Sequence, residues 1–493
     1  MIPTPSINPP VVVNATKVPV HRRRLHQSVG TLAAALLLTG CGALIPAYER
    51  PQAPVPAQFP GNGSAAAAAS DGQTGIRAPD LAWQDFFQDE RLRYLIQVAL
   101  DNNRDLRVAV LNLEQARAQL QVRRADEVPT VGVGATGSRQ STANGGSTTT
   151  YTAGFTITGF EADFFGRLRN LSEAAQAQLL GTIEARKTVQ IGLIASVANS
   201  YLALQADDAL LAITRETLAS REESLRLTRL TFEHGVSSGL ELRQAESLVE
   251  GARVTLAQLE RQRALDANTL DLLLGQNLSD AQRAALPEGL SLTRHGLVGI
   301  MPGGLPSEVL LRRPDVRAAE QQLLAANANI GAARAAFYPR ITLTTSIGTA
   351  SNQLSGLFRS GSYGWSFAPQ IILPIFDGGR NQANLDAAQV GRDIAVAQYE
   401  KTIQSAFREV ADALATRATL ADQLRAQVAQ AQAEQGRLTL VDLRYEQGTA
   451  SAFERLDAQR ATFAVRQAVV QLQLLQAQSL VAVYKALGGG WKD

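Results

Sequence analysis

The sequence predicts a mainly α-helical protein with a smaller β part, in which one structural unit occurs twice. Hydrophobic residues recur every three or four positions on both sides of two short turns at Gly235 and Gly448, the pattern of coiled-coil hairpins. Two pairs of segments with period-two alternation lie between the helical stretches, as β-strands require. All 19 prolines lie outside 130–286 and 375–493, so proline interrupts no helix in those two stretches.

The N-terminal part has the features of a lipoprotein export signal. His21-Arg-Arg-Arg24 is basic, and Thr31–Leu38 is an apolar run too short to span a bilayer. Leu38-Thr-Gly-Cys41 resembles the bacterial lipobox, in which a peptidase cuts before the Cys and the thiol is acylated. We therefore predict a signal peptide over 1–40 and a lipid such as palmitate on Cys41. The alternative is a buried thiol with a chance pattern upstream of it.

Composition and charge exclude several classes of function. The net charge of +2 gives no reason to expect nucleic acid. Cys41 is the single Cys, so no intrachain disulfide is possible. Once the signal is removed, the remaining His and Met residues are His234, His295 and Met301. We therefore expect no metal site based on His, Cys or Met, no Cys/His catalysis and no cofactor, and we do not expect an enzyme.

Residues 41–82 are expected to tether the protein to its lipid anchor, because this segment is rich in Pro, Ala, Gly and Ser. The first repeat follows over 83–286. Its expected elements are a helix over 89–127, strands over 130–142 and 151–162, a long helix from Phe164 to His234, and a return helix over 240–274. Ser238 and Glu241 form a capping-box pattern at the start of the return helix.

The long helix of the first repeat is expected to be a rod. About 68 residues at about 1.5 Å each give roughly 100 Å, a length that suits a bridge rather than a globular domain. The return helix and the helix before the strands are each about half as long. We therefore expect these two to stack end to end beside the long helix, with a belt halfway along where the chain enters and leaves.

The same order of elements is expected a second time, over 314–487. Asp315-Val-Arg-Ala-Ala319 repeats Asp105-Leu-Arg-Val-Ala109 after 210 residues. Pro339-Arg-Ile-Thr-Leu343 repeats Pro129-Thr-Val-Gly-Val133 at the same offset. The sequence therefore predicts an internal duplication. The remaining segments are a linker over 287–313 and a tail over 488–493.

The four expected strands have the length and period of membrane-crossing β-structure, although a soluble hairpin has the same pattern. Four strands cannot close a barrel, and lipid does not tolerate an open sheet edge. Two chains would supply eight strands, whose interior side chains fill. Three chains would supply twelve, which leave room for a water-filled lumen. The predicted fold is therefore a trimer with a twelve-stranded β-barrel and a barrel of long helices.

Four motifs support a specific resemblance. They are Leu310-Leu-Arg-Arg-Pro-Asp-Val-Arg-Ala-Ala-Glu320, Gly331-Ala-Ala-Arg-Ala-Ala-Phe-Tyr-Pro339, Leu373-Pro-Ile-Phe-Asp-Gly-Gly-Arg380 and Tyr484-Lys-Ala-Leu-Gly-Gly-Gly-Trp491. In this order they resemble the TolC-type outer-membrane efflux channels, and the OprM/NodT lipoprotein branch in particular, over residues 38–491.

The resemblance implies a homotrimer, anchored to outer-membrane lipid, whose helices form a periplasmic tunnel. It implies docking onto a periplasmic adaptor (membrane fusion) protein and an inner-membrane transporter of the resistance-nodulation-division type. The channel would then be a passive conduit that opens at its periplasmic tip and does no chemistry.

By the same resemblance the turns at Gly235 and Gly448 lie at this tip. Four residues of the second hairpin would line the aperture: Tyr445, Phe453, Glu454 and Asp457. Two of them have a structural alternative, since Glu454 is the N3 residue of a capping box with Ser451 and Tyr445 lies on the heptad seam. Asp457 lies beyond the first helical turn, where neither cap nor dipole requires an acid, and is the better gate candidate. Gln244 replaces this acid in the first hairpin, which suggests an aperture lined chiefly by the second.

Two other functions fit parts of the pattern. The same duct could serve protein export by a type I, ABC-driven system. A lipid-anchored coiled-coil scaffold without a pore would need the strand pairs to be soluble hairpins. A hydrolase is the weakest candidate, because no nucleophile–base or metal constellation occurs in the sequence.

Overall fold

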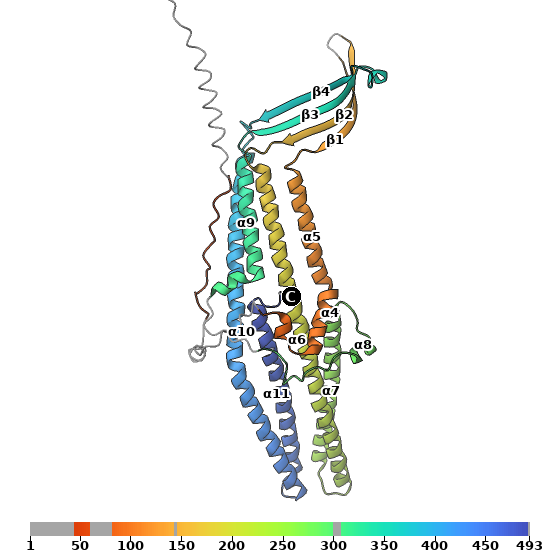
Figure 1. Cartoon of the computed structure of the whole chain (residues 1–493). Helices are drawn as coiled ribbons and strands as arrows, with labels where there is room; N and C mark the ends of the chain where they lie inside the picture. Colours follow the sequence, from red (N-terminus) through yellow and green to blue (C-terminus); the bar gives the residue numbers. More distant parts are fainter. Residues whose placement is uncertain (1–43, 60–80, 142–144, 299–306, 492–493) are drawn as a thin grey trace, which may run out of the picture. The chain divides into compact units, whose positions relative to one another are not determined.

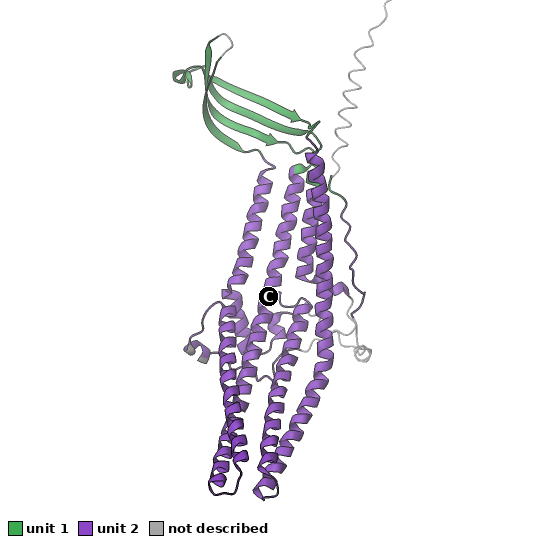
Figure 2. Cartoon of the chain, turned by 180° about the vertical axis from the view of Figure 1, so that it is seen from behind, with its two compact units in different colours: residues 1–46, 129–167, 331–377 green, residues 47–128, 168–330, 378–493 purple. Residues whose placement is uncertain are grey.

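The structure is a computed structural model that describes residues 44–59, 81–141, 145–298 and 307–491. The expected signal peptide and Cys41 lie outside these ranges. The chain forms two compact units, coloured separately in Figure 2. Unit 1 contains 129–167 and 331–377, and unit 2 contains 47–128, 168–330 and 378–493. Each unit therefore draws on both of the repeats expected from the sequence.

Unit 1 is built on one antiparallel sheet of four strands in the order β1-β2-β3-β4 (Figure 1). The strands are β1 (Val131–Ser141), β2 (Ser147–Glu161), β3 (Arg340–Ser351) and β4 (Tyr363–Ile372), with a one-turn helix η3 (Leu354–Gly356) between the last two. Two strands from each half of the chain are thus confirmed. The second strand begins earlier than the expected residue 151, because Ser147–Thr150 continue the ladder opposite Ser138–Ser141.

The two faces of the sheet differ in chemistry. Val133 pairs with Phe155, Phe155 with Ile347, and Ile347 with Trp365, so these four side chains form a row on one face. All four are exposed in the single chain. One register step away, on the opposite face, lies the row Gly132, Thr156, Ser346 and Ser366. One face is therefore apolar and the other is polar and small.

A row of glycines crosses all four strands on the polar face. Gly134 pairs with Gly154, Gly154 with Gly348, and Gly348 with Gly364. A Cβ on Gly154 would collide with the carbonyl of Ile347 and the Cα of Gly348. Strands β2 and β3 therefore approach each other more closely here than any side chain allows.

Unit 2 is built mainly from long helices. They are α3 (Trp83–Phe86), α4 (Glu90–Asn102), α5 (Arg104–Ala125), α6 (Arg167–Glu233), α7 (Gly239–Leu274), α8 (Asp280–Ala284), η2 (Ser307–Arg312), α9 (Pro314–Ala335), α10 (Arg380–Glu446) and α11 (Ala452–Ala486); α6 begins, and α9 ends, within unit 1. Helices α6 and α10 each have 67 residues, which confirms the two expected rods of roughly 100 Å. Helices α7 and α11 are about half as long and return beside them (Figure 1).

The expected belt is formed where short helices meet. The side chain of Asn103 accepts from Leu106 N at 3.0 Å and so caps α5, while its amide donates to the carbonyl of Leu273 near the end of α7 at 2.9 Å. Gly275 ends α7 with φ +70°, and a Cβ there would collide with the carbonyl of Asn102. Helix α7 therefore stops against the break between α4 and α5.

Aromatic packing and a buried arginine hold the belt together. Phe86 is fully buried and stacks on Tyr484, with ring centroids 4.0 Å apart. The Tyr484 hydroxyl donates to the carbonyl of Leu81 at 2.9 Å. Arg313 is buried and donates to Asp315, to Glu409 and to the carbonyl of Ala486. These contacts fix the N-terminal segment and the ends of α9 and α11 to one another.

Among the described helices, α6 contains the one stretch whose length and hydropathy would allow it to cross a membrane. Within the protein, 56% of that stretch is buried. Apolar residues of α6 such as Ile194, Val197 and Leu202 belong to the hydrophobic core, so tertiary packing accounts for the apolar character of that part of the helix.

Candidate functional site

The first hairpin turn, between α6 and α7, has a tightly bonded backbone. Gly235 adopts φ +74°, and Val236 N donates to the carbonyl of Thr231 at 2.8 Å. Ser238 accepts from Glu241 N at 3.3 Å, and the Glu241 carboxylate accepts from Ser238 N at 3.0 Å. The capping box predicted for the return helix is therefore confirmed.

The second turn, between α10 and α11, repeats this backbone geometry. Gly448 adopts φ +71°, and Thr449 N donates to the carbonyl of Arg444 at 2.8 Å. Ser451 accepts from Glu454 N at 3.2 Å and so caps α11. The two hairpins thus end alike, with a left-handed glycine and a serine cap.

The prediction of a full capping box in the second turn is wrong. The Glu454 carboxylate lies 3.3 Å from the Arg444 guanidinium instead of closing the box with Ser451 N. Arg444 also donates to the carbonyl of Thr449 at 3.1 Å, so its guanidinium is already held over the turn. An ionised partner competes successfully with a neutral backbone N–H for the carboxylate.

Asp457 lies between two arginines. Its carboxylate is 3.3 Å from Arg437 on α10 and 2.6 Å from Arg460 one turn along α11. The hydrogen bond to Glu434, and after it the bond to Asp457, raises the pKa of the Arg437 guanidinium. Within one chain, Asp457 therefore has two arginine partners that compensate its negative charge. These pairs give Asp457 a structural role that the sequence did not indicate.

Tyr445 and Phe453 lie in different surroundings. The Arg455 guanidinium lies 5.0 Å from the centroid of the Tyr445 ring and is 2.7 Å from Asp442. Phe453 is 61% exposed, an unusual state for a phenylalanine on a helical seam. The seam of the second hairpin therefore does not bury Phe453 in the single chain.

The second hairpin carries four arginines that the sequence pattern did not single out: Arg437, Arg444, Arg455 and Arg460. Each pairs with an acid of the same hairpin. The three-residue spacing of Asp457 and Arg460 was a signal for one of these pairs. The others join α10 to α11, so only the tertiary structure reveals them.

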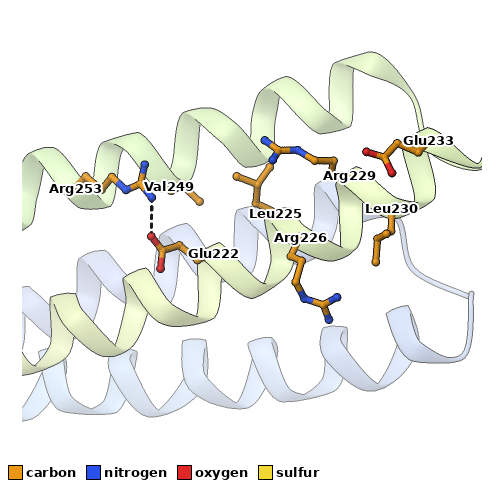
Figure 3. Close-up of a pocket in the computed structure, with 8 residues that line it drawn as sticks. All are labelled: Glu222, Leu225, Arg226, Arg229, Leu230, Glu233, Val249 and Arg253. Atoms are coloured by element: carbon orange, nitrogen blue, oxygen red, sulfur yellow. Dashed lines mark hydrogen bonds and ion pairs between the residues drawn. The ribbon is translucent and has the colours of Figure 1, made fainter.

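A groove of about 370 Å³ lies on the first hairpin (Figure 3). Its lining residues are Glu222, Leu225, Arg226, Arg229, Leu230, Glu233, Val249 and Arg253. Arg253 on α7 bridges to Glu222 on α6 at 2.8 Å across one side of the groove. Leucine side chains between charged ends give this groove the mixed chemistry of a helix-docking surface.

The two hairpins are joined to each other along α6 and α11. Arg466 pairs with Glu216 at 2.7 Å, and the Arg221 guanidinium lies 4.9 Å from the centroid of the Phe463 ring. Arg221, on α6, is buried and donates to the carbonyl of Leu248, so it contacts both α7 and α11. Within the described residues, no group of three or more His, Cys, Asp or Glu side chains could hold a metal ion.

Comparison with known proteins identifies the chain's relatives. The model of the family described as outer membrane efflux protein matches residues 95–276 and 305–489. The chain is 47% identical to the toluene efflux pump outer membrane protein TtgC of Pseudomonas putida over 466 residues, which cover 93% of this chain and 94% of that protein. It is 44% identical to the outer membrane protein OprJ of Pseudomonas aeruginosa over 472 residues, covering 94% of this chain and 96% of that one.

A solved structure of an outer membrane channel is also similar to this chain. The MtrE outer membrane channel of Neisseria gonorrhoeae, in its open state, matches with a TM-score of 0.83 and 40% identity, covering 92% of this chain and 99% of that chain.

Proposed function

This chain belongs to the outer membrane efflux protein family and is an outer-membrane channel of a tripartite efflux system, and from that premise we propose how it works. Three copies form a passive exit duct. Their strands complete a twelve-stranded barrel in the outer membrane, and their long helices form a tunnel through the periplasm. The chain performs no catalysis and needs no cofactor.

The observation that carries this proposal is the two-faced sheet with β1 and β4 at its edges. An exposed apolar row next to a polar row is the pattern of a sheet with lipid on one side and water on the other. Each edge strand pairs with one neighbour in the described chain, which leaves a ladder of backbone groups for another copy. Closure of the barrel by further copies pairs the edge strands and turns the apolar face toward lipid.

The tips of the helical hairpins are proposed to meet a periplasmic adaptor, which connects the duct to an inner-membrane transporter of the resistance-nodulation-division type. The groove lined by Glu222, Arg253 and Leu225 supports this, because it offers apolar contact flanked by charge to a partner helix. Tyr445, Phe453, Glu454 and Asp457 are proposed to line the aperture. The exposure of Phe453 supports this position, since an apolar ring at the tip gains a partner when three copies meet.

Two further assignments complete the proposal. Cys41 carries the lipid anchor, in agreement with the Leu38-Thr-Gly-Cys41 motif. The transported compounds are small solutes rather than secreted proteins, in agreement with relatives such as the toluene efflux pump outer membrane protein. The pore-free scaffold is disfavoured because it leaves the apolar face of the sheet in water.

Conductance in planar lipid bilayers tests the duct. We expect the purified full-length protein to insert and to give stepwise currents with a cation preference. A matched control is protein denatured and added at the same concentration in the same detergent. A folded protein that inserts into vesicles and never conducts, even after the tip has been loosened by Asp457→Ala, would show that no duct exists.

A further inference from the structure

A buried carboxyl group on α6 has no ion pair with any of the described residues. Asp207 on α6 is 6% exposed, and its Oδ2 atom has no hydrogen-bond partner in the described protein. The adjacent Asp208 is exposed and takes the nearby cation, with its carboxylate 2.5 Å from Arg263 on α7. Burial of a charged carboxylate without such a partner is strongly unfavourable. Asp207 therefore has a strong reason to hold a proton.

Asp266 is the group that faces Asp207 from α7. It is half-buried, and one of its oxygens, Oδ2, accepts from Gln262 at 3.2 Å. Its backbone carbonyl accepts from Ser200 on α6 at 3.4 Å, which holds this turn of α7 against α6. The charged groups that act on Asp207 are thus Asp208 on its own helix, and Arg263 and Asp266 on α7.

These groups act in opposite directions on Asp207. Burial, followed by the hydrogen bond to Asp266 and the charges of Asp266 and Asp208, raises the pKa of Asp207 to about 7, against the smaller effect of Arg263. Two carboxyl groups that interact in a buried site hold one proton between them more readily than none or two.

We propose that Asp207 and Asp266 form a proton-binding site that joins α6 to α7, in which one shared proton closes the contact and its loss opens it. With the proton bound, one carboxyl donates to the other and the buried Oδ2 atom is satisfied. Without it, two negative charges face each other while Arg263 is held by Asp208.

The direction of the pH effect follows from the raised pKa. The usual pKa of an aspartate in an unfolded chain is 3.8, and that of Asp207 in the folded protein is about 7. The folded state therefore binds the proton more tightly than the unfolded state does. The stabilising effect of this site is complete below about pH 4 and is lost as the pH rises through about 7.

The site thus makes the packing of the first hairpin respond to pH near neutrality. Since α6 and α7 carry the groove near the tip, the joint at Asp207 adjusts how firmly that hairpin is held. The site does not depend on the transport function, because it binds a proton whether or not a solute passes.

Infrared difference spectroscopy on the intact protein in lipid nanodiscs tests the proposal. We expect a protonated carboxyl band that disappears as the pH is raised from about 5 to about 9, with a midpoint near 7. Asp207→Asn should abolish this band. In parallel, we measure the hydrogen-exchange rate of the α7 segment around Asp266, corrected for the intrinsic effect of pH. In the wild type this rate should increase at pH values above the same midpoint. In Asp207→Asn it should not depend on pH.

The matched control is Glu260→Gln, which removes an exposed carboxylate from the same helix pair, 3.2 Å from Arg215. This variant should keep the band and its midpoint. If Asp207→Asn does not assemble, the same infrared titration is carried out on Asp266→Asn. The midpoint of the carboxyl band should then fall by about one pH unit, because the negative charge facing Asp207 has been removed. A band that persists in Asp207→Asn, or a midpoint unmoved in Asp266→Asn, would overturn the proposal.

Discussion

At the scale of single residues, the tip is governed by pairs of opposite charge. Asp457 is bridged by Arg437 and Arg460, and Glu454 by Arg444. An aperture lined by three copies would therefore present alternating charges rather than a bare ring of acids. Such exposed pairs contribute about 0–1 kcal/mol each, so they can separate without unfolding the hairpin. Weak pairs of this kind are suited to a mouth that opens.

The two acids of the tip should differ when they are substituted. Asp457→Ala removes the carboxylate that joins Arg437 to Arg460 and leaves Arg437 paired with Glu434 alone. We therefore expect weaker cation selectivity, weaker block by divalent cations and a looser closed mouth. Glu454→Gln keeps a side chain that fits the first turn of α11, so it should conduct like the wild type and lose at most about 1 kcal/mol of stability.

Single-channel recordings of both variants and of the double variant, at two salt concentrations, measure these effects. Unchanged conductance and selectivity in Asp457→Ala would remove Asp457 from the gate and leave it a structural ion-pair residue.

At the scale of elements, small residues decide where strands and helices meet. The glycine row lets β2 and β3 approach closely in the curved sheet that Figure 1 shows. At the belt, Gly275 lets the end of α7 abut the carbonyl of Asn102. The glycine row does not follow from local propensity, since glycine weakens strand interiors. At Gly275 the left-handed helix end already favours glycine, and the close approach of Asn102 adds a second reason. Each glycine is needed because another segment occupies the space of a side chain.

The glycine row supplies its own control. Gly154→Ala places a Cβ against the backbone of β3, and such overpacking costs about 1–3 kcal/mol. Gly134→Ala, in the same row on β1, meets nothing within 4 Å. We expect Gly154→Ala to lower the yield and the heat resistance of the folded oligomer on semi-denaturing gels, and Gly134→Ala to leave both unchanged. Equal behaviour of the two variants would contradict the close approach of β2 and β3.

At the scale of the whole molecule, the single chain leaves apolar surface exposed on both of its units. The row from Val133 to Trp365 is exposed in unit 1, and Val108, Leu111 and Val122 are exposed on α5 in unit 2. Large exposed apolar areas mark surfaces for lipid or for other chains. The chain thus has the surface of a subunit, in agreement with the proposed trimer.

The lipid on Cys41 should be dispensable for assembly. A closed barrel buries far more apolar surface in the bilayer than acyl chains do, so Cys41→Ser should still form folded oligomers in the outer membrane. The variant should fail to incorporate radiolabelled palmitate, whereas the wild type should be labelled. Palmitate that still enters Cys41→Ser would refute the lipid assignment, and recovery of the wild type mainly in the inner membrane would contradict the localisation.

The sequence by itself determined the elements, because their signals are local and repeated. Heptad spacing and the absence of proline predicted α6 and α10, and period two predicted all four strands. The left-handed turns at Gly235 and Gly448 follow from residues within a few positions of each.

Only the tertiary structure decided how charge is distributed. It paired Asp457 with Arg437 across the hairpin and Glu454 with Arg444 in place of a capping bond. Asp207 is buried in the folded chain, while Arg263 pairs with its neighbour Asp208. These arrangements depend on the register of two antiparallel helices, in which one residue of slip changes every partner. Hydrophobic periodicity specifies which face of a helix is buried, but it does not specify that register.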